Sequence, residues 1–175
     1  MDPSVERQPH GPAIVRIRAI AKEVCDLHTD PADHEPAAVL THEMVYAAFC
    51  GWCEQHDVDV MTELVLAAAV ATQRCGATQA ARCDLLDVAH PMTKHLRRSL
   101  PSSAIREVRD CVLDIATCDP PTPEMALDVD DDEHAEELAI ALFTWLGALG
   151  SAYAAVNDAT VDDALHHLLP DHPRL

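Results

Sequence analysis

The chain has 175 residues, and its 30 acidic residues against 12 lysines and arginines give a formal net charge of −18. Hydrophobic residues make up 49% and charged residues 24%, which is typical of one globular domain with a core and excludes a disordered or fibrous chain. The negative charge argues against general nucleic-acid binding, because such binding needs a basic surface.

Helix-forming residues dominate the chain, with 28 alanines and 18 leucines against five glycines, and no long run alternates as a strand would. We therefore predict an all-α fold, with a flexible arm over 1–11 and a single helical domain over 12–175. About seven or eight helices are expected to form a bundle around a buried apolar helix, 138–156. In chain order the predicted helices cover 12–28, 37–56, 60–74, 78–89, 92–99, 101–118, 138–156 and 160–169.

Helix boundaries follow from capping residues. Asp59 is placed to cap the helix that starts at position 60, because its side chain can accept a backbone N–H of the first turn. Thr160 and Asp163 have the spacing of a capping box. Gly76 and Pro101 are typical of a helix end and a first helical turn, respectively.

The segment 138–156 contains 19 residues without a charge, which reaches the length of a membrane span. Six of these residues are alanine, acidic residues flank the segment, and no lysine or arginine lies near either end. We therefore interpret it as a buried core helix rather than a membrane span. Gly147, Ser151 and Ala155 recur every four residues and predict a close approach of a neighbouring helix.

Seven cysteines are spread through the helical segments, and their odd number is not typical of a secreted disulfide framework. The N-terminus has no basic start followed by an apolar run, so no signal peptide is expected. These observations favour free thiols in a reducing, cytoplasmic compartment. The cysteines stand at positions 25, 50, 53, 75, 83, 111 and 118.

The densest group of metal-ligating residue types lies near the end of the second predicted helix. Cys50, Cys53 and His56 are each three residues apart, and His42 falls on the same side of the helix. Such a set is compatible with a structural zinc site or with a redox dithiol. Buried, unreactive thiols are the simpler interpretation, because no second pair of cysteines with this spacing exists and the pair is not at a helix N-terminus.

A second enzymatic alternative uses histidine and aspartate. His56 and Asp57, with His28 before them and Asp114 after them, resemble the order of metal ligands in HD-type phosphohydrolases. That resemblance implies a metal-dependent all-α phosphohydrolase. The apolar run that precedes the HD pair in that family is interrupted here by Glu54 and Gln55.

Charge is distributed unevenly along the chain. Residues 119–137 hold nine acids and no lysine or arginine, whereas 94–109 hold five basic residues and one acid. The basic stretch either pairs with the acidic one, within the chain or between subunits of a homo-oligomer, or forms a recognition face. Its basic residues are Lys94, Arg97, Arg98, Arg106 and Arg109.

No catalytic constellation is complete in the sequence. We therefore expect a non-enzymatic, adaptor-like helical protein that binds a protein partner through a groove beside the apolar helix or through the basic face. No cofactor is expected, with zinc as the alternative if the cysteine and histidine cluster binds a metal.

Overall fold

All elements of the structure are helical. The computed structural model describes residues 11–28, 46–75, 102–117, 127, 129 and 131–171, and within these ranges no strand occurs. The all-α prediction is therefore confirmed for the described part of the chain. Its helices are a helix over 46–55, here called segment 46–55, and α1 (Gly11–His28), α3 (Val60–Cys75), α5 (Ser102–Ala116), α6 (Asp132–Asn157) and α7 (Val161–Leu168).

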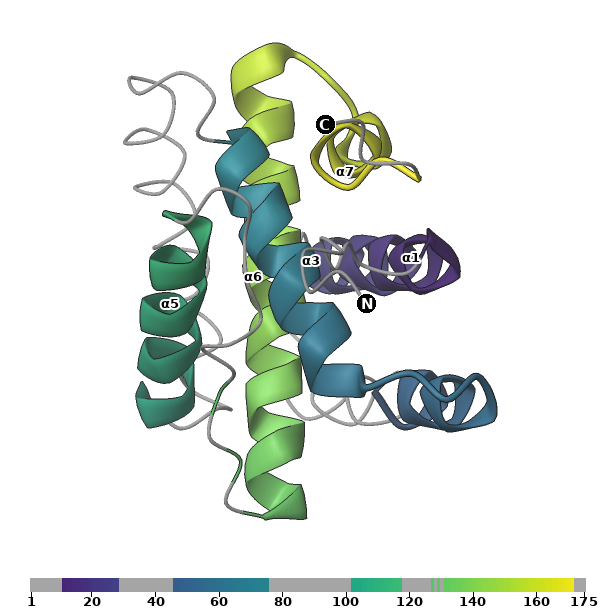
Figure 1. Ribbon diagram of the computed structural model, residues 1–175. Helices are drawn as coiled ribbons and strands as arrows, with labels where there is room; N and C mark the ends of the chain where they lie inside the picture. Colours follow the sequence, from purple (N-terminus) through teal and green to yellow (C-terminus); the bar gives the residue numbers. More distant parts are fainter. Residues whose placement is uncertain are drawn as a thin grey trace, which may run out of the picture.

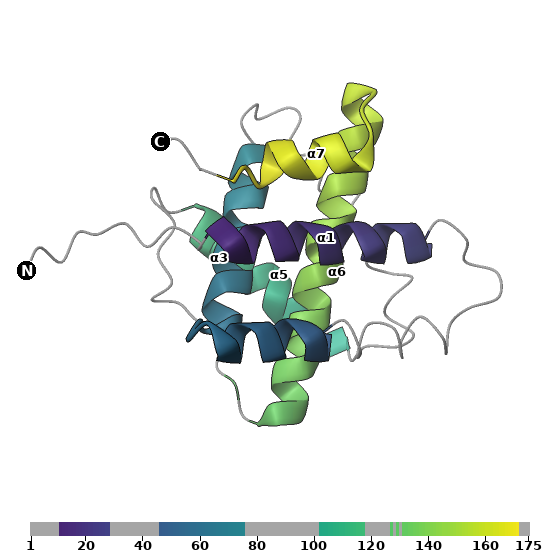
Figure 2. The same ribbon diagram turned by 90° about the vertical axis from the view of Figure 1, so that its right-hand side faces the viewer.

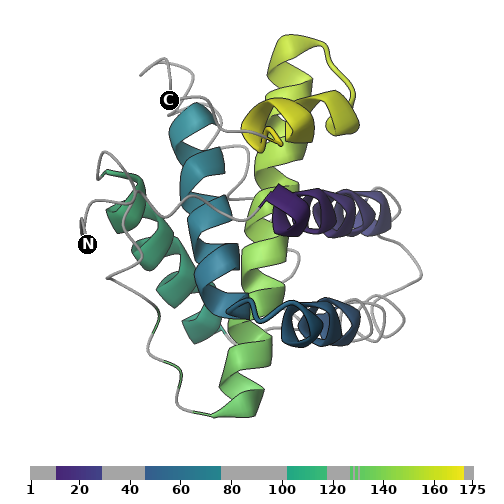
Figure 3. The same ribbon diagram turned by 45° about the vertical axis from the view of Figure 1, so that its right-hand side comes forward.

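The helix α6 lies at the centre of the described structure and contacts α1, α3, α5 and α7. The helices α3 and α5 run beside α6 (Figure 1). On the other side, α7, α1 and segment 46–55 lie one after another across α3 and α6 (Figures 2 and 3). The α3–α6 pair therefore lies between α5 and segment 46–55.

The helix α6 starts six residues before the apolar segment that the sequence marks as 138–156. Its 26 residues begin at Asp132, and the side chain of Asp131 accepts a hydrogen bond from the backbone N–H of His134 at 2.8 Å. Acidic side chains near a helix N-terminus are stabilised by the helix dipole, which explains why the charged residues join the helix.

Most of the apolar part of α6 is enclosed by protein, whereas its last residues, Ala155 and Val156, are exposed. All residues from Leu138 to Gly150 are buried, as the sequence predicts for a core helix. Within the described residues, α6 is the one helix whose length and composition would suit a membrane span, and most of that stretch is buried inside the protein. A central helix that other helices surround has the same composition.

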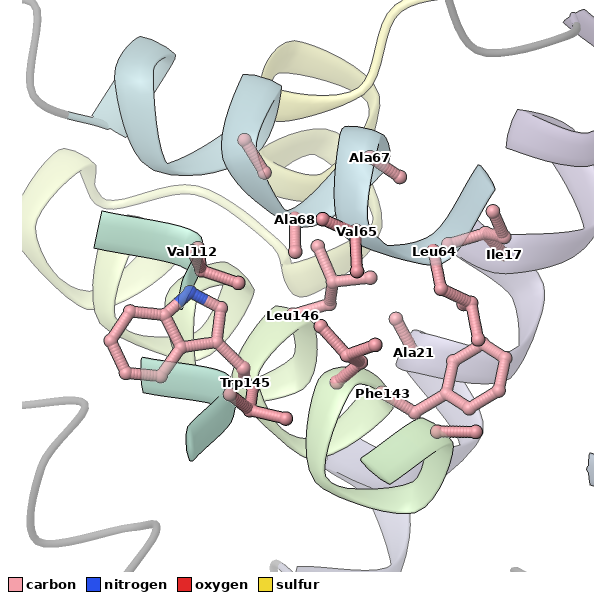
Figure 4. Close-up of a cluster of buried hydrophobic side chains, with 14 of the residues drawn as sticks. Ile17, Ala21, Leu64, Val65, Ala67, Ala68, Val112, Phe143, Trp145 and Leu146 are labelled. Carbon is pink, nitrogen blue, oxygen red and sulfur yellow. The ribbon is translucent and has the colours of Figure 1, made fainter. Parts of the chain in front are cut away.

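The core forms where apolar faces of four helices meet α6. On α1, Ile14, Ile17 and Ala21 are buried in this core, whereas Arg16 and Lys22 are exposed. Side chains from α1, α3, α5 and α6 point toward one another in Figure 4, where Leu146 lies near Val65 and Ala68. Burial of this apolar surface is the main driving force for the fold.

Two sharp corners connect consecutive helices, and each is made by an aspartate in the left-handed conformation. Asp57 has a φ of 54° and Asp158 a φ of 50°. At the first corner the N–H of Val58 donates to the carbonyl of Cys53 at 3.0 Å. At the second the N–H of Ala159 donates to the carbonyl of Ala154 at 3.0 Å. These bonds satisfy carbonyls that a helix end would otherwise leave without a partner.

Both predicted N-caps follow these corners at the same spacing. The side chain of Asp59 accepts a hydrogen bond from the N–H of Thr62 at 2.7 Å. The hydroxyl of Thr160 accepts from the N–H of Asp163 at 3.1 Å. The capping predictions at these two positions are therefore confirmed, because short polar side chains satisfy the first N–H groups of α3 and α7.

The left-handed aspartates allow a test of backbone strain. We expect Asp57→Gly to raise the free energy of unfolding by about 0.5 kcal/mol, because glycine has no Cβ to clash but loses more freedom on folding. Asp57→Ala is the matched control and should lower it by about 0.5 kcal/mol, since alanine tolerates this conformation less well than aspartate. Urea denaturation of both variants measures the difference, and equal stabilities would contradict the prediction.

Several predicted elements lie outside the described residues. They are residues 1–10 of the predicted arm 1–11, the first part of the predicted helix 37–56, the helices 78–89 and 92–99, and the boundary residues Gly76 and Pro101. The last residue of the predicted arm, Gly11, is instead the first residue of α1. In the described part, the predicted helix 101–118 is observed as α5, and the last predicted helix is observed as α7.

The C-terminal end of α7 is held by two arginines from other helices. The Arg18 side chain of α1 donates to the carbonyl of Leu169 at 2.6 Å and pairs with Asp171 at 2.5 Å. Arg74 of α3 donates to the carbonyl of His167 at 2.9 Å. Cations are favourable at a helix C-terminus, so both arginines fix α7 against α1 and α3.

Candidate functional site

Segment 46–55 presents its aromatic residues to α1 and α6. Phe49 packs edge to face on Phe143 of α6, with ring centroids 5.6 Å apart. The Trp52 ring is stacked with His56 at 4.3 Å, and the guanidinium of Arg16 lies 5.0 Å from its centroid. Trp52 is therefore buried between neighbours, and this aromatic group anchors the segment instead of forming an open pocket.

The two cysteines of the segment are held in their protonated form. Burial raises the pKa of Cys53 to about 11, and the neighbouring Cys50, Glu63 and Asp59 add to this shift. Burial also raises the pKa of Cys50, although its hydrogen bond with Tyr46 acts in the opposite direction. Since the thiolate is the nucleophile, these thiols are poorly suited to redox exchange.

The other described thiols have the same character. Burial raises the pKa of both Cys75 and Cys111 to about 11, with Asp114 and Glu107 contributing at Cys111. Cys50, Cys53 and Cys75 are free thiols. This agrees with the simpler interpretation of the cysteines as small apolar side chains.

The raised thiol pKa values predict a loss of stability at alkaline pH. A buried Cys75 stays protonated in the folded protein up to about pH 11, whereas an unfolded thiol ionises near pH 8.5. Ionisation then favours the unfolded chain, so stability is complete below about pH 8.5 and falls as the pH rises toward 11. We expect the free energy of unfolding to fall more steeply with pH in the wild type than in Cys75→Ala. The difference between the two slopes should be less than about 1 kcal/mol per pH unit.

Urea titrations at several pH values between 8 and 11 measure the two slopes. Parallel curves for the wild type and Cys75→Ala would contradict the assigned burial of this thiol. The alanine variant is the appropriate control because arginine, lysine and tyrosine ionisation affects both proteins alike.

The predicted metal ligands are not brought together within the described residues. Cys53 is buried, Cys50 is half-buried and His56 is exposed. The Nδ1 of His56 donates a hydrogen bond to the carbonyl of Trp52 at 2.8 Å. No group of three or more potential ligands is formed by the described side chains, and His42 lies outside them.

Zinc binding by this cluster stays a prediction. Metal analysis of the purified, tag-free protein decides it, since one zinc per chain would support the site. A content far below one ion per chain would exclude it.

The residues that resemble an HD-type site are also distributed over the fold. His56 and Asp57 form the turn directly after segment 46–55, whereas Asp114 lies on α5, beyond the α3–α6 pair (Figure 1). The side chain of His28 lies outside the described ones. The described geometry therefore offers no support for a shared metal between these residues.

The basic stretch 94–109 is described only where it enters α5. Arg106 is exposed, and it forms no ion pair with another described residue. Arg109 pairs with its neighbour Asp110 through Nη2 at 2.8 Å and is also partly exposed. Lys94, Arg97 and Arg98 lie outside the described residues.

The described contact between the two stretches joins a histidine of the acidic stretch to the one acid of the basic stretch. His134, which stands in the acidic block, lies 3.2 Å from Glu107, the single acid of the basic stretch. No described ion pair joins Arg106 or Arg109 to an acid of α6. The described acids of α6 therefore do not neutralise these two arginines.

Sequence reasoning missed the polar groups that the fold buries. Arg18 is only 7% exposed, and Thr72 accepts a hydrogen bond from the indole N–H of Trp145 at 3.0 Å. Neither belongs to a motif, and their partners are more than 70 residues away in the chain. No local signal in the sequence indicates such contacts.

Comparison with models of protein families, with curated proteins and with solved structures finds no match for this chain. No residue role is therefore carried over from a relative.

Proposed function

We propose that this protein is a non-enzymatic helical interaction protein that binds a protein partner through its basic face, residues 94–109. The observation that carries the proposal is the exposed Arg106 on the outer side of α5, which the acidic residues of α6 leave available. An exposed guanidinium is suited to carboxylate and phosphate groups, because its N–H donors match two oxygens at once.

The partner is expected to present acidic groups to this face. The protein as a whole carries a charge of −18, so an acidic partner would be repelled at a distance and attracted only at this local surface. Such a combination favours specificity over general attraction. The proposal includes one domain over 12–175, with seven or eight helices arranged as a bundle around α6.

The groove alternative is less well supported by the described contacts. The side of α6 that faces α1 and α3 is occupied by α7, whose Leu165 and Leu168 are fully buried there. A partner helix at that position would first have to displace α7. The face on α5 requires no such change.

Charge reversal at one position tests the proposal. Arg106→Glu should abolish or weaken capture of the partner, whereas Lys22→Glu should leave it unchanged, because Lys22 is an equally exposed cation on α1. Both variants change the net charge by the same amount. Quantitative affinity purification from the native host compares them with the wild type.

If Arg106→Glu and Lys22→Glu capture the partner equally well, the assignment of this face is overturned. The double variant Arg97→Glu/Arg98→Glu extends the test to the part of the basic stretch that precedes α5. Wild-type binding that weakens as the salt concentration rises, and that either reversal abolishes, would support a charge-dependent contact.

A further inference from the structure

The corner between α6 and α7 consists of residues 158–160 and depends on one strained conformation. Asp158 has φ 50° and ψ 44°, in the left-handed region. Residues with a Cβ adopt this region at a steric cost. The cost is lower for aspartate than for most residues, but it is higher than for glycine. The protein therefore places a costly residue at the point where the chain turns from α6 into α7.

The sequence around this corner is otherwise compatible with an uninterrupted helix. No glycine or proline occurs between Gly150 and Pro170. Asp158 in the right-handed conformation would join α6 and α7 into one helix over 132–168. Within this stretch the corner is held by the left-handed Asp158, by the bond from the Ala159 N–H to the Ala154 carbonyl and by the N-cap hydroxyl of Thr160.

The groups that hold α7 all belong to parts of the chain before the corner. Arg18 and Arg74 bind the carbonyls of Leu169 and His167, and Arg18 also pairs with Asp171. A Cβ added at Gly150 would lie 2.8 Å from Cδ2 of Leu165, so α7 packs directly on the α6 backbone at this glycine. Every copy of the chain carries the same receiving surface.

We infer that this corner is a hinge through which two copies of the protein exchange α7. In the exchanged dimer α6 and α7 form one helix, and α7 occupies the site on the partner formed by α1, α3 and α6. The contacts of Leu165 and Leu169 are then remade between copies instead of within one.

The occupant of this site is a second copy because the site fits α7 itself. Leu165 is 1% exposed and Leu168 and Leu169 are 0% exposed, so a detached α7 would leave three leucine side chains in water. An identical α7 restores those contacts together with both arginine bonds. Short hinges under strain favour such an exchange over simple opening.

Two substitutions at the hinge should shift the equilibrium between the monomer and the exchanged dimer in opposite directions. Asp158→Ala disfavours the left-handed conformation and favours a continuous helix, whereas Asp158→Gly relieves the corner. After refolding at equal, high concentration, we expect the dimer fraction of Asp158→Ala to exceed that of Asp158→Gly by about tenfold or more. Size-exclusion chromatography with light scattering measures both fractions.

Thr160→Ala provides an independent route to the same state, because it removes the N-cap of α7 without changing Asp158. It should also raise the dimer fraction above that of the wild type. This variant keeps the inference testable even if Asp158→Ala does not refold.

Exchange differs from ordinary dimerisation in which chain supplies the residues that contact α7. In a dimer of mixed isotope-labelled and unlabelled chains, the Leu165 methyl groups should show nuclear Overhauser effects to Gly150 of the other chain. Dimers in which these effects arise only within one chain would overturn the inference. So would Asp158→Ala and Thr160→Ala proteins that fold but remain as monomeric as Asp158→Gly.

Discussion

Replacing Arg18 by alanine is expected to lower the free energy of unfolding by about 3 kcal/mol. The side chain is 8% exposed, and its two hydrogen bonds end on the carbonyl of Leu169 and the carboxylate of Asp171. Removing the guanidinium leaves the buried Leu169 carbonyl without a partner and creates a void between α1 and α7. Urea denaturation measures the loss, which corresponds to a decrease in Tm of roughly 6–12 °C for a chain of this size.

Two controls separate the buried bond from charge effects. Arg16→Ala removes the same residue type from the exposed side of α1 and should cost less than about 1 kcal/mol, the value of one cation–π contact. Asp171→Asn keeps the buried carbonyl bond and alters only the exposed partner, so its effect should also stay below about 1 kcal/mol. Equal losses in Arg18→Ala and Arg16→Ala would contradict the anchoring role of Arg18.

Threonine-to-valine substitutions at two buried positions are expected to change stability in opposite directions. Thr72→Val should lower the free energy of unfolding by about 2 kcal/mol, because the Thr72 hydroxyl accepts from the Trp145 indole N–H and donates to the carbonyl of Ala68. Thr144→Val should raise it by up to about 1 kcal/mol, since the Thr144 hydroxyl is buried and has no hydrogen-bond partner among the described residues.

The pair forms a matched experiment because both residues are nearly fully buried, at 2% and 3% exposure, and valine has nearly the same shape as threonine. Chemical denaturation of the two variants and the double variant measures each effect and their additivity. Thr72→Ser should keep most of the stability of the wild type, because serine retains the hydroxyl that makes both hydrogen bonds. A stabilising Thr72→Val, or a Thr144→Val as damaging as Thr72→Val, would contradict the assigned hydrogen bonding.

The basic face and the exchange of α7 concern different parts of the molecule. The first depends on Arg106 on α5 and the second on Asp158 at the far end of α6. A variant at Arg106 therefore tests partner binding without altering the hinge, and a variant at Asp158 tests self-association without altering the basic face. The two proposals can fail independently.

Local patterns in the sequence determined the helical class, most helix boundaries in the described ranges and the caps at Asp59 and Thr160. Periodic apolar residues and short polar caps act over one or two helical turns, so they are readable without knowing the fold. The absence of charge over 138–156, together with its many alanines and the flanking acids, likewise identified the core helix, because a helix that other helices surround can be apolar on all sides.

Only the tertiary structure decided which polar side chains lie inside and what they bind. Arg18 and Leu169 are 151 residues apart, and Thr72 and Trp145 are 73 residues apart, so no local pattern links either pair. The place of α7 against α1, α3 and α6 was likewise decided by packing between distant segments. Burial of a polar group is tolerated only where a partner exists, and the folded arrangement of distant segments supplies that partner.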